Sequence, residues 1–320
     1  MGSKPLVRPP RLARGSRVAL VAPAGPLLEQ DDIARAEALC RALDYEPVLG
    51  AHAGGHFGYF SGTDEERLAD LNAALQDPAI DAIWCIRGGY GVTRILDGID
   101  FEALVRRPRP VVGYSDITAL LAGVVRRACM IAFHGPTARA EMPPFTRRHF
   151  AKVLTGVEPA GPLEPLPTPG DVLVPRNDRV TVIHGGRAEG VLAGGNLSLL
   201  QCLIGTRYFP DLDGAMLVLE DVNEDLYRID RMLAHLRAVG AFATLRGVLI
   251  GRFTGLKRHM DDGSLGVDQV LTHYFGALGI PVLNGLPIGH IDDQWTIPLG
   301  VRARVDADAG SVELLEAAVA

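Results

Sequence analysis

The sequence predicts an α/β fold: an N-terminal, Rossmann-like domain on a parallel sheet, followed by a smaller, β-rich α+β domain. In roughly the first 155 residues, short β-rich runs alternate with helical patterns, as in βαβ units. A Pro-rich stretch then interrupts the pattern, and beyond it strands and helices follow without strict alternation. The chain of 320 residues also exceeds the size at which one hydrophobic core usually stops growing, so two domains are expected.

The first domain is expected over residues 1–157. Its second helix carries the strongest local signal, because Thr63 and Glu66 have the spacing of a capping box. The predicted elements, in chain order, are the strand 17–23, the helices 31–44 and 63–76, the strands 79–86 and 110–114, the helix 116–128 and the strand 130–136.

Residues 158–180 are predicted to link the domains, because their six prolines can hold neither a helix nor a central strand. The second domain is expected over 181–320. Its predicted elements are the strands 215–221 and 247–253, the helices 224–240 and 267–279, and a closing hairpin of 301–307 and 311–317.

Composition and charge exclude several classes of partner. The net charge is -6 and basic residues are dispersed, which gives no footprint for nucleic acid or for an anionic membrane. The apolar run at 18–22 is too short for a signal peptide, and no segment is long enough to span a bilayer. We therefore expect a soluble, cytoplasmic protein that acts on a small substrate.

The four cysteines are far apart and have no spacing suited to zinc, so no metal or cofactor is predicted. Cys85 and Cys129 lie in or beside apolar, strand-like runs. Both are expected to be reduced and packed in the core.

A candidate nucleophile lies in the stretch RPVVGYSDITAL, residues 109–120. Ser115 follows an apolar strand on a tight turn into a helix, which would direct its hydroxyl into the crevice at the carboxyl ends of the strands. The turn departs from the G-x-S-x-G elbow, because Ile117 occupies the second glycine position. An equally simple interpretation is that Ser115 or Asp116 only caps the helix.

A glycine-rich loop, IRGGYGVTRIL, follows the predicted strand 79–86. Its spacing gives neither a dinucleotide fingerprint nor a phosphate-binding loop with its lysine, and a tight turn would explain the glycines. It also suits an oxyanion hole, in which the amide of Gly88 or Gly89 would act together with the amide of Asp116.

A serine nucleophile needs a base and a carboxylate that orients the base. His290 is favoured among nine histidines because it lies in a loop punctuated by Gly and Pro after an apolar strand, and His134 at another strand end is its competitor. Glu220 ends an apolar strand and is the candidate carboxylate, although neighbouring Asp221 could serve equally well.

Four motifs in register, GYSDITAL, RGGYG, LEDVNEDLYRIDRML and GLPIGH, resemble those of the LD-carboxypeptidases, the muramoyltetrapeptide carboxypeptidase group of serine peptidases. The resemblance implies that Ser115 is the nucleophile, His290 the general base and Glu220 the group that orients His290. It also implies a homodimer without a metal, with the serine on the first domain and its two partners on the second.

The implied reaction releases terminal D-alanine from the tetrapeptide of cell-wall fragments in peptidoglycan recycling. Arg87 and Arg228 are candidates for binding the free carboxylate, although a solvated, salt-bridged helix face explains Arg228 as well. One alternative is similar to the microcin C immunity peptidases, which cleave aminoacyl-nucleotide conjugates. Another is a Rossmann-type nucleotide-binding protein, in which RGGYG holds phosphate and Ser115 is a cap.

Overall fold

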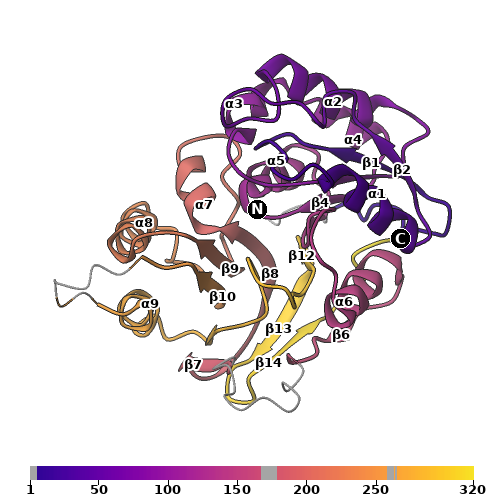
Figure 1. Ribbon diagram of the computed structural model, residues 1–320. Coiled ribbons are helices and arrows are strands. Elements are labelled where there is room, and N and C mark those ends of the chain that lie inside the picture. The colour runs from indigo at the N-terminus through magenta and orange to yellow at the C-terminus, as the bar shows by residue number, and fades with distance from the viewer. Residues whose placement is uncertain (1–5, 167–178, 258–262, 264) are drawn as a thin grey trace, which may run out of the picture.

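The computed structural model describes residues 6–166, 179–257, 263 and 265–320, and it is an α/β protein built on two sheets (Figure 1). The sheet formed mainly by the first half of the chain is mostly parallel, and the sheet formed by the second half is mixed. The predicted fold class is therefore confirmed. No helix in the described ranges is long and apolar enough to cross a membrane.

The first sheet has six strands in the order β12-β5-β4-β3-β1-β2, and all neighbours are parallel except β12 and β5. Its strands are β1 (Arg17–Val21), β2 (Glu46–Leu49), β3 (Ala82–Cys85), β4 (Val111–Gly113), β5 (Ala132–His134) and β12 (Ile297–Leu299).

Helices and short 3-10 turns connect these strands. The predicted capping box is present, because the Thr63 hydroxyl accepts the Glu66 amide and the Glu66 carboxylate accepts the Thr63 amide. The elements are α1 (Asp32–Ala42), α2 (Asp64–Gln76), α3 (Val92–Ile95), η1 (Leu96–Gly98), α4 (Phe101–Arg106), η2 (Ser115–Ile117), α5 (Thr118–Arg127) and α6 (Pro144–Thr155).

The second sheet has eight strands in the order β6-β14-β13-β8-β9-β10-β11-β7, with the four from β8 to β11 parallel. Helices α7 (Leu197–Leu203), α8 (Leu226–Ala238) and α9 (Val267–Phe275) lie on its outer side (Figure 1). Its strands are β6 (Gly161–Pro162), β7 (Thr181–His184), β8 (Arg187–Asn196), β9 (Ala215–Val222), β10 (Gly247–Thr254), β11 (Val282–Asn284), β13 (Arg302–Asp306) and β14 (Ser311–Leu314).

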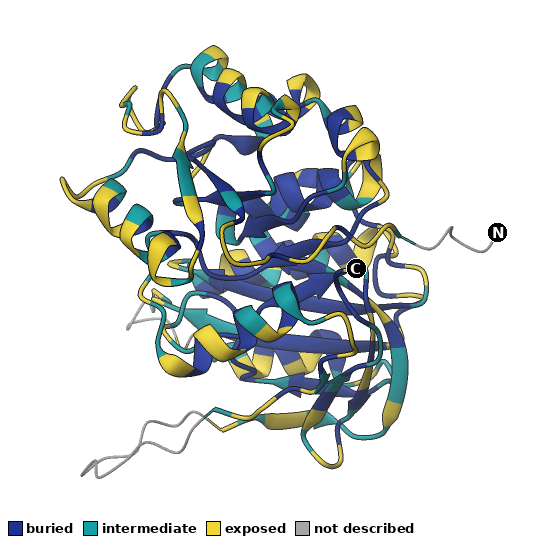
Figure 2. Cartoon of the chain, turned by 90° about the vertical axis from the view of Figure 1, so that its right-hand side faces the viewer, coloured by how far each residue is buried: buried dark blue, intermediate teal, exposed yellow. Residues whose placement is uncertain are grey.

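Two hydrophobic cores meet on the strands of the second sheet. On β9, Met216 and Val218 belong to the core shared with the first sheet, whereas Leu217 and Leu219 belong to the core under α7, α8 and α9. This alternation follows from the two-residue period of a strand, and it leaves the strands of both sheets largely buried (Figure 2). The side chains at the end of β9 should therefore also point to opposite sides.

The chain returns to the first sheet late in the sequence. Strand β12 pairs with β5 in an antiparallel register, with Ile297 opposite His134. Residues 167–178 of the expected linker lie outside the described residues. The described part of the linker contains the edge strand β6, where the missing N–H of Pro162 interrupts no hydrogen-bond ladder between central strands. The division into domains 1–157 and 181–320 stays a prediction.

Candidate active site

Ser115 lies in a strained turn between β4 and α5. Its φ angle of 66° is in the left-handed region, which costs a residue with a Cβ conformational energy. Neither η2 nor α5 has a side-chain cap at its N-terminus, so neither Ser115 nor Asp116 is a helix cap. The strain therefore needs a reason other than capping, and exposing the hydroxyl at the strand end is one.

The glycine loop after β3 lies directly against this turn. A Cβ on Gly88 would lie 2.8 Å from the Cβ and 3.0 Å from the Oγ of Ser115, and 3.4 Å from the amide nitrogen of Asp116. Only glycine allows this approach without a shift of the backbone. The N–H groups of Gly88 and Gly89 have no hydrogen-bond acceptor among the residues described, so both remain available as donors.

His290 and Glu220 form a direct pair. The Nδ1 atom of His290 lies 2.7 Å from Oε2 of Glu220, and the two side chains are 19% and 0% exposed. The ring of Tyr114 packs against the His290 ring with 4.7 Å between centroids. The structure thus brings the histidine–carboxylate pair next to the residue that precedes Ser115.

The alternation along β9 separates the two candidate carboxylates. Glu220 points toward the first sheet and meets His290. Asp221 points toward α7, where its Oδ2 accepts the amide and hydroxyl of Ser198 at 3.0 and 2.7 Å. Burial raises the pKa of Asp221. Of the two carboxylates left open by the sequence, Glu220 is the one that contacts His290.

Asn196, which was not predicted from the sequence, links the two halves of this site. Its amide group donates to Oε1 of Glu220 at 3.2 Å and to Oδ1 of Asp221 at 3.0 Å. Its backbone N–H donates to Thr118 Oγ1 at 3.1 Å, at the start of the helix that follows Ser115. An asparagine directly before a helical pattern is a recognisable N-cap, and its side-chain oxygen does accept the Leu199 amide.

His134 lies near the same group of residues but is not paired with a carboxylate. Its ring is fully buried, and neither nitrogen has a partner among the described residues. Burial lowers the pKa of His134 to about 4, so the ring is neutral at physiological pH. The contact with Glu220 distinguishes His290 from this competitor.

The two candidate arginines lie in different places. Arg87 precedes the glycine loop, and its guanidinium donates to the carbonyl oxygen of Pro26; burial lowers its pKa. Arg228 lies on α8, half exposed, with Asp225 at 3.3 Å and Glu224 at 3.9 Å. No hydrogen bond or ion pair in the described part of the chain joins either arginine to Ser115, Glu220 or His290.

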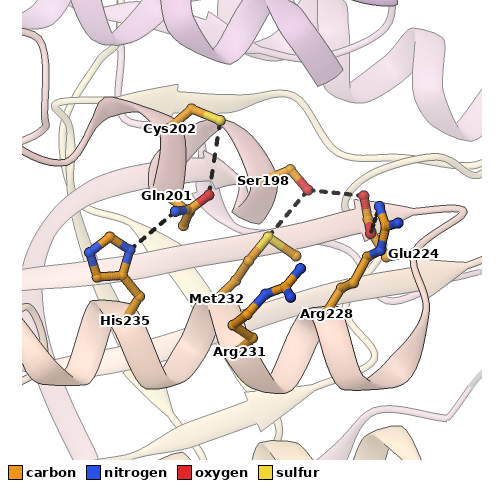
Figure 3. Close-up of a pocket in the computed structure, with 8 residues that line it drawn as sticks. All are labelled: Ser198, Gln201, Cys202, Glu224, Arg228, Arg231, Met232 and His235. Carbon is orange, nitrogen blue, oxygen red and sulfur yellow. Dashed lines mark hydrogen bonds and ion pairs between the residues drawn. The ribbon is translucent and has the colours of Figure 1, made fainter.

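Arg228 also lines a cavity of about 450 Å³ between α7 and α8 (Figure 3). The Ser198 hydroxyl lies in this cavity and bonds to Asp221, so the cavity floor is connected through Asp221 and Asn196 to Glu220. The other lining residues are Gln201, Cys202, Glu224, Arg231, Met232 and His235.

The cysteines agree only in part with expectation. All four are free; Cys85 is buried as predicted, whereas Cys129 is exposed. The prediction for Cys129 was wrong because the chain turns there with a φ of 49°, just before β5, and directs the side chain to solvent. No group of three or more His, Cys, Asp or Glu side chains suited to a metal occurs within the described ranges.

Both halves of the chain are similar to known proteins of one family. Residues 18–135 match the family model of the LD-carboxypeptidase N-terminal domain, and residues 189–305 match that of the C-terminal domain. Together the two models cover more than half of the chain.

Individual relatives are similar to this chain over nearly its full length. A carboxypeptidase homologue of Streptomyces coelicolor is 39% identical, covering 97% of this chain and 96% of the relative. The murein tetrapeptide carboxypeptidase of Pseudomonas aeruginosa is 35% identical, and the match covers 91% of this chain and 94% of the relative. The solved structure of the microcin C7 self-immunity protein MccF with aspartyl sulfamoyl adenosine is 25% identical, with a TM-score of 0.89 over 98% of this chain and 100% of the other.

Proposed function

The chain belongs to the LD-carboxypeptidase family, and we propose that it is a serine carboxypeptidase that removes the terminal D-alanine of murein tetrapeptides. The observation that carries the proposal is the 2.7 Å contact of His290 with buried Glu220, next to the turn that holds Ser115. A relative named as a murein tetrapeptide carboxypeptidase supports the choice of substrate. The reaction contributes to peptidoglycan recycling.

In the proposed acylation step, Ser115 Oγ attacks the carbonyl carbon between the L-configured centre of the third residue and D-alanine. His290 Nε2 takes the hydroxyl proton, because Glu220 holds the proton of Nδ1 and so fixes the tautomer. The resulting imidazolium donates its proton to the leaving amine, and the C–N bond breaks to release D-alanine.

In the tetrahedral intermediate, the carbonyl oxygen carries a negative charge. The amide of Asp116 and the free amides of Gly88 and Gly89 are the proposed donors to this oxyanion, and they lie on either side of the contact between the glycine loop and the nucleophile turn. Water then attacks the acyl-enzyme with His290 as base, and the tripeptide leaves as a carboxylate. This mechanism uses no metal and no cofactor.

A carboxypeptidase must also recognise the free carboxylate of its substrate. Arg87 is the proposed partner closest in sequence to the oxyanion donors. Arg228 is the second candidate, and together with Arg231 it brings positive charge to the cavity between α7 and α8 (Figure 3). Loss of the interaction between the substrate carboxylate and either arginine would raise KM for a peptide with a free C-terminus but not for the corresponding C-terminal amide.

We further propose that the protein is a homodimer in the cytoplasm. The four free thiols are compatible with a reducing compartment. Sedimentation velocity of the purified chain tests the dimer, and cell fractionation tests the location.

The central experiment measures conversion of tetrapeptide to tripeptide by the wild type and by Ser115→Ala, Glu220→Ala and His290→Ala. We expect conversion by the wild type and loss of several orders of magnitude in each variant. Exposed Ser311→Ala is the matched control and should keep full activity. Undiminished activity of Ser115→Ala would overturn the serine mechanism and favour a nucleotide-binding or other role for the turn.

The likeness to MccF supports a second candidate within the same family, a peptidase that acts on aminoacyl-nucleotide conjugates. Both candidate functions use the same nucleophile, so only a comparison of substrates can discriminate between them. A panel of murein tetrapeptides with diaminopimelate or lysine at the third position, set against an aminoacyl sulfamoyl adenosine, compares kcat/KM directly. A higher value for the nucleotide conjugate would replace the murein proposal.

A further inference from the structure

The side chain of Asp116 connects the two loops of the proposed site. It is only 1% exposed, and its Oδ2 atom accepts the backbone N–H of Val92 at 2.9 Å. Asp116 follows β4 in the nucleophile turn, whereas Val92 begins α3 directly after the glycine loop. One hydrogen bond therefore joins segments that are 24 residues apart.

This bond fixes the far end of the glycine loop. At the near end, the backbone of Gly88 rests against Ser115 and the amide nitrogen of Asp116. At the far end, the loop is held to the same turn by the bond from Val92 to the Asp116 carboxylate. The residues between, which include Gly89 with a φ of 122°, are therefore held against the nucleophile turn at both ends.

The surroundings of Asp116 offer little compensation for a buried carboxylate. The cation that faces it is Arg67 on α2, and this guanidinium is already bonded to Asp64 and to the Pro23 carbonyl. Among the described residues, the other titratable groups that face it are the thiols of Cys85 on β3 and Cys202 on α7, whose pKa values are raised by burial, so both are neutral at physiological pH. A buried, poorly compensated carboxylate is costly, which indicates a role beyond local stability.

We propose that the Asp116 carboxylate is a positioning residue that holds the glycine loop and the nucleophile turn in register, so that the Asp116 and Gly88 amides converge on one oxyanion. This inference rests on the proposed function, because it assigns the purpose of the bond to the same site. Asp116 acts through the loop and does not itself touch the substrate with its side chain.

The positioning role gives the activity an additional pH dependence. Burial raises the pKa of Asp116 to about 6. Above pH 6 the ionised carboxylate accepts the Val92 N–H strongly, and as the pH falls through 6 the protonated group becomes a weaker acceptor. The contribution of Asp116 to catalysis is therefore present on the alkaline side and is lost on the acid side.

The test compares Asp116→Ala, which removes the acceptor, with Asp116→Asn, which keeps a carbonyl oxygen in nearly the same place. We expect Asp116→Ala to lower kcat on tetrapeptide about 100-fold, with KM within about threefold, as for the loss of an oxyanion donor. We expect Asp116→Asn to recover most of kcat and to lose the titration near pH 6.

Asp70→Ala is the matched control. Asp70 is a buried aspartate in the same half of the chain that accepts the backbone N–H of His52 at 2.8 Å, far in sequence from the nucleophile turn. The Asp70→Ala substitution should lower the midpoint of thermal unfolding with little change in kcat. A similar loss of kcat in Asp70→Ala, or unchanged kcat in Asp116→Ala, would overturn the positioning role.

A second measurement needs no substrate. Hydrogen exchange of the Val92 amide, followed by NMR, should be faster in Asp116→Ala and nearly unchanged in Asp116→Asn. Equal protection of Val92 in all variants would overturn the inference. Failure of the wild type to cleave any peptide would overturn the proposed function alone, since the amide exchange still reports whether Asp116 holds the loop.

Discussion

His290 and Glu220 are 70 residues apart in sequence, yet the His290 Nδ1 and Glu220 Oε2 atoms lie 2.7 Å apart. Glu220 is fully buried within β9, and its second oxygen accepts the Asn196 amide. Both oxygens are thus committed, which holds the carboxylate in one orientation and the imidazole in one plane. In the proposed mechanism, a base that is oriented in this way can act on Ser115 without first being ordered by a substrate.

Removal of the charge at Glu220 should slow catalysis far more than removal of the charge at Asp221. Glu220→Gln keeps the shape but presents an N–H or a weak acceptor to His290, so we expect kcat to fall about 10³- to 10⁴-fold. Asp221→Asn affects the contacts with Ser198, Asn196 and the Val222 amide, none of which involves His290, and we expect a loss of about tenfold or less. Steady-state kcat of both variants gives the comparison, and the reverse order would identify Asp221 as the orienting group.

Replacement of Ser115 by glycine should remove activity and raise stability together. The φ of 66° costs serine about 1 kcal/mol, which glycine does not incur. We expect Ser115→Gly to show no turnover and a free energy of unfolding about 1 kcal/mol above that of the wild type.

Cys129→Gly is the control for this prediction. Cys129 is exposed, has a φ of 49° and lies outside the site, so the substitution should stabilise the protein with unchanged kcat. Urea unfolding of both variants measures the effect. A Ser115→Gly protein less stable than the wild type would show that the turn is not strained by its side chain.

A methyl group on Gly88 should disrupt the oxyanion site. The added Cβ would lie 2.8 Å from that of Ser115, so the loop and the turn must separate. We expect Gly88→Ala to reduce kcat about 100-fold, with a smaller effect on KM. Gly266→Ala is the control, because its φ is -79° and its nearest neighbour, Gln269 Oε1, is 3.6 Å from the added atom. Full activity of Gly88→Ala would exclude this loop from the oxyanion hole.

Two buried histidines should destabilise the protein in acid. Burial lowers the pKa values of His134 and His149 to about 4, so between pH 6.5 and 4 the unfolded chain binds protons that the folded chain does not. Stability is therefore lost as the pH falls through this range, by up to roughly 3 kcal/mol for each histidine.

Urea unfolding at pH 7 and at pH 4.5 checks this prediction. His149→Gln should reduce the difference in stability between the two pH values, whereas His273→Gln, at an exposed position, should leave it as in the wild type. The same difference in the wild type and in His149→Gln would mean that His149 is already protonated in the folded protein at pH 4.5.

Much of the first sheet could be predicted from sequence, because local patterns determine its elements. The apolar strands and the capping box at Thr63 are signals within a few residues of each other. Helix α6 was not predicted, although Pro144 at its first turn is a usable start signal. Strand β12 could not be recognised, because it has three residues including Pro298, and its partner β5 is distant in sequence.

The candidate site shows the same division between local and distant information. The residues of the turn and the glycine loop could be proposed from their motifs, but the choice between Glu220 and Asp221 depends on which face of β9 meets the first sheet. The N-cap role of Asn196 can be recognised from the local sequence. Its contacts with Glu220 and Thr118 depend on the packing of the two sheets, so its place in the site could not be predicted.

The pairing of β12 with β5 has a consequence for synthesis of the chain. We expect the edge of the first sheet to stay open on the ribosome until residues 297–299 emerge, because among the described residues β12 is the strand that pairs with β5 on that side. An unpaired edge strand favours association with other chains, so a nascent or truncated polypeptide that lacks this segment should depend on chaperones. Glu220 and His290 both precede β12 in the chain, so the proposed catalytic pair is already synthesised when this edge can close.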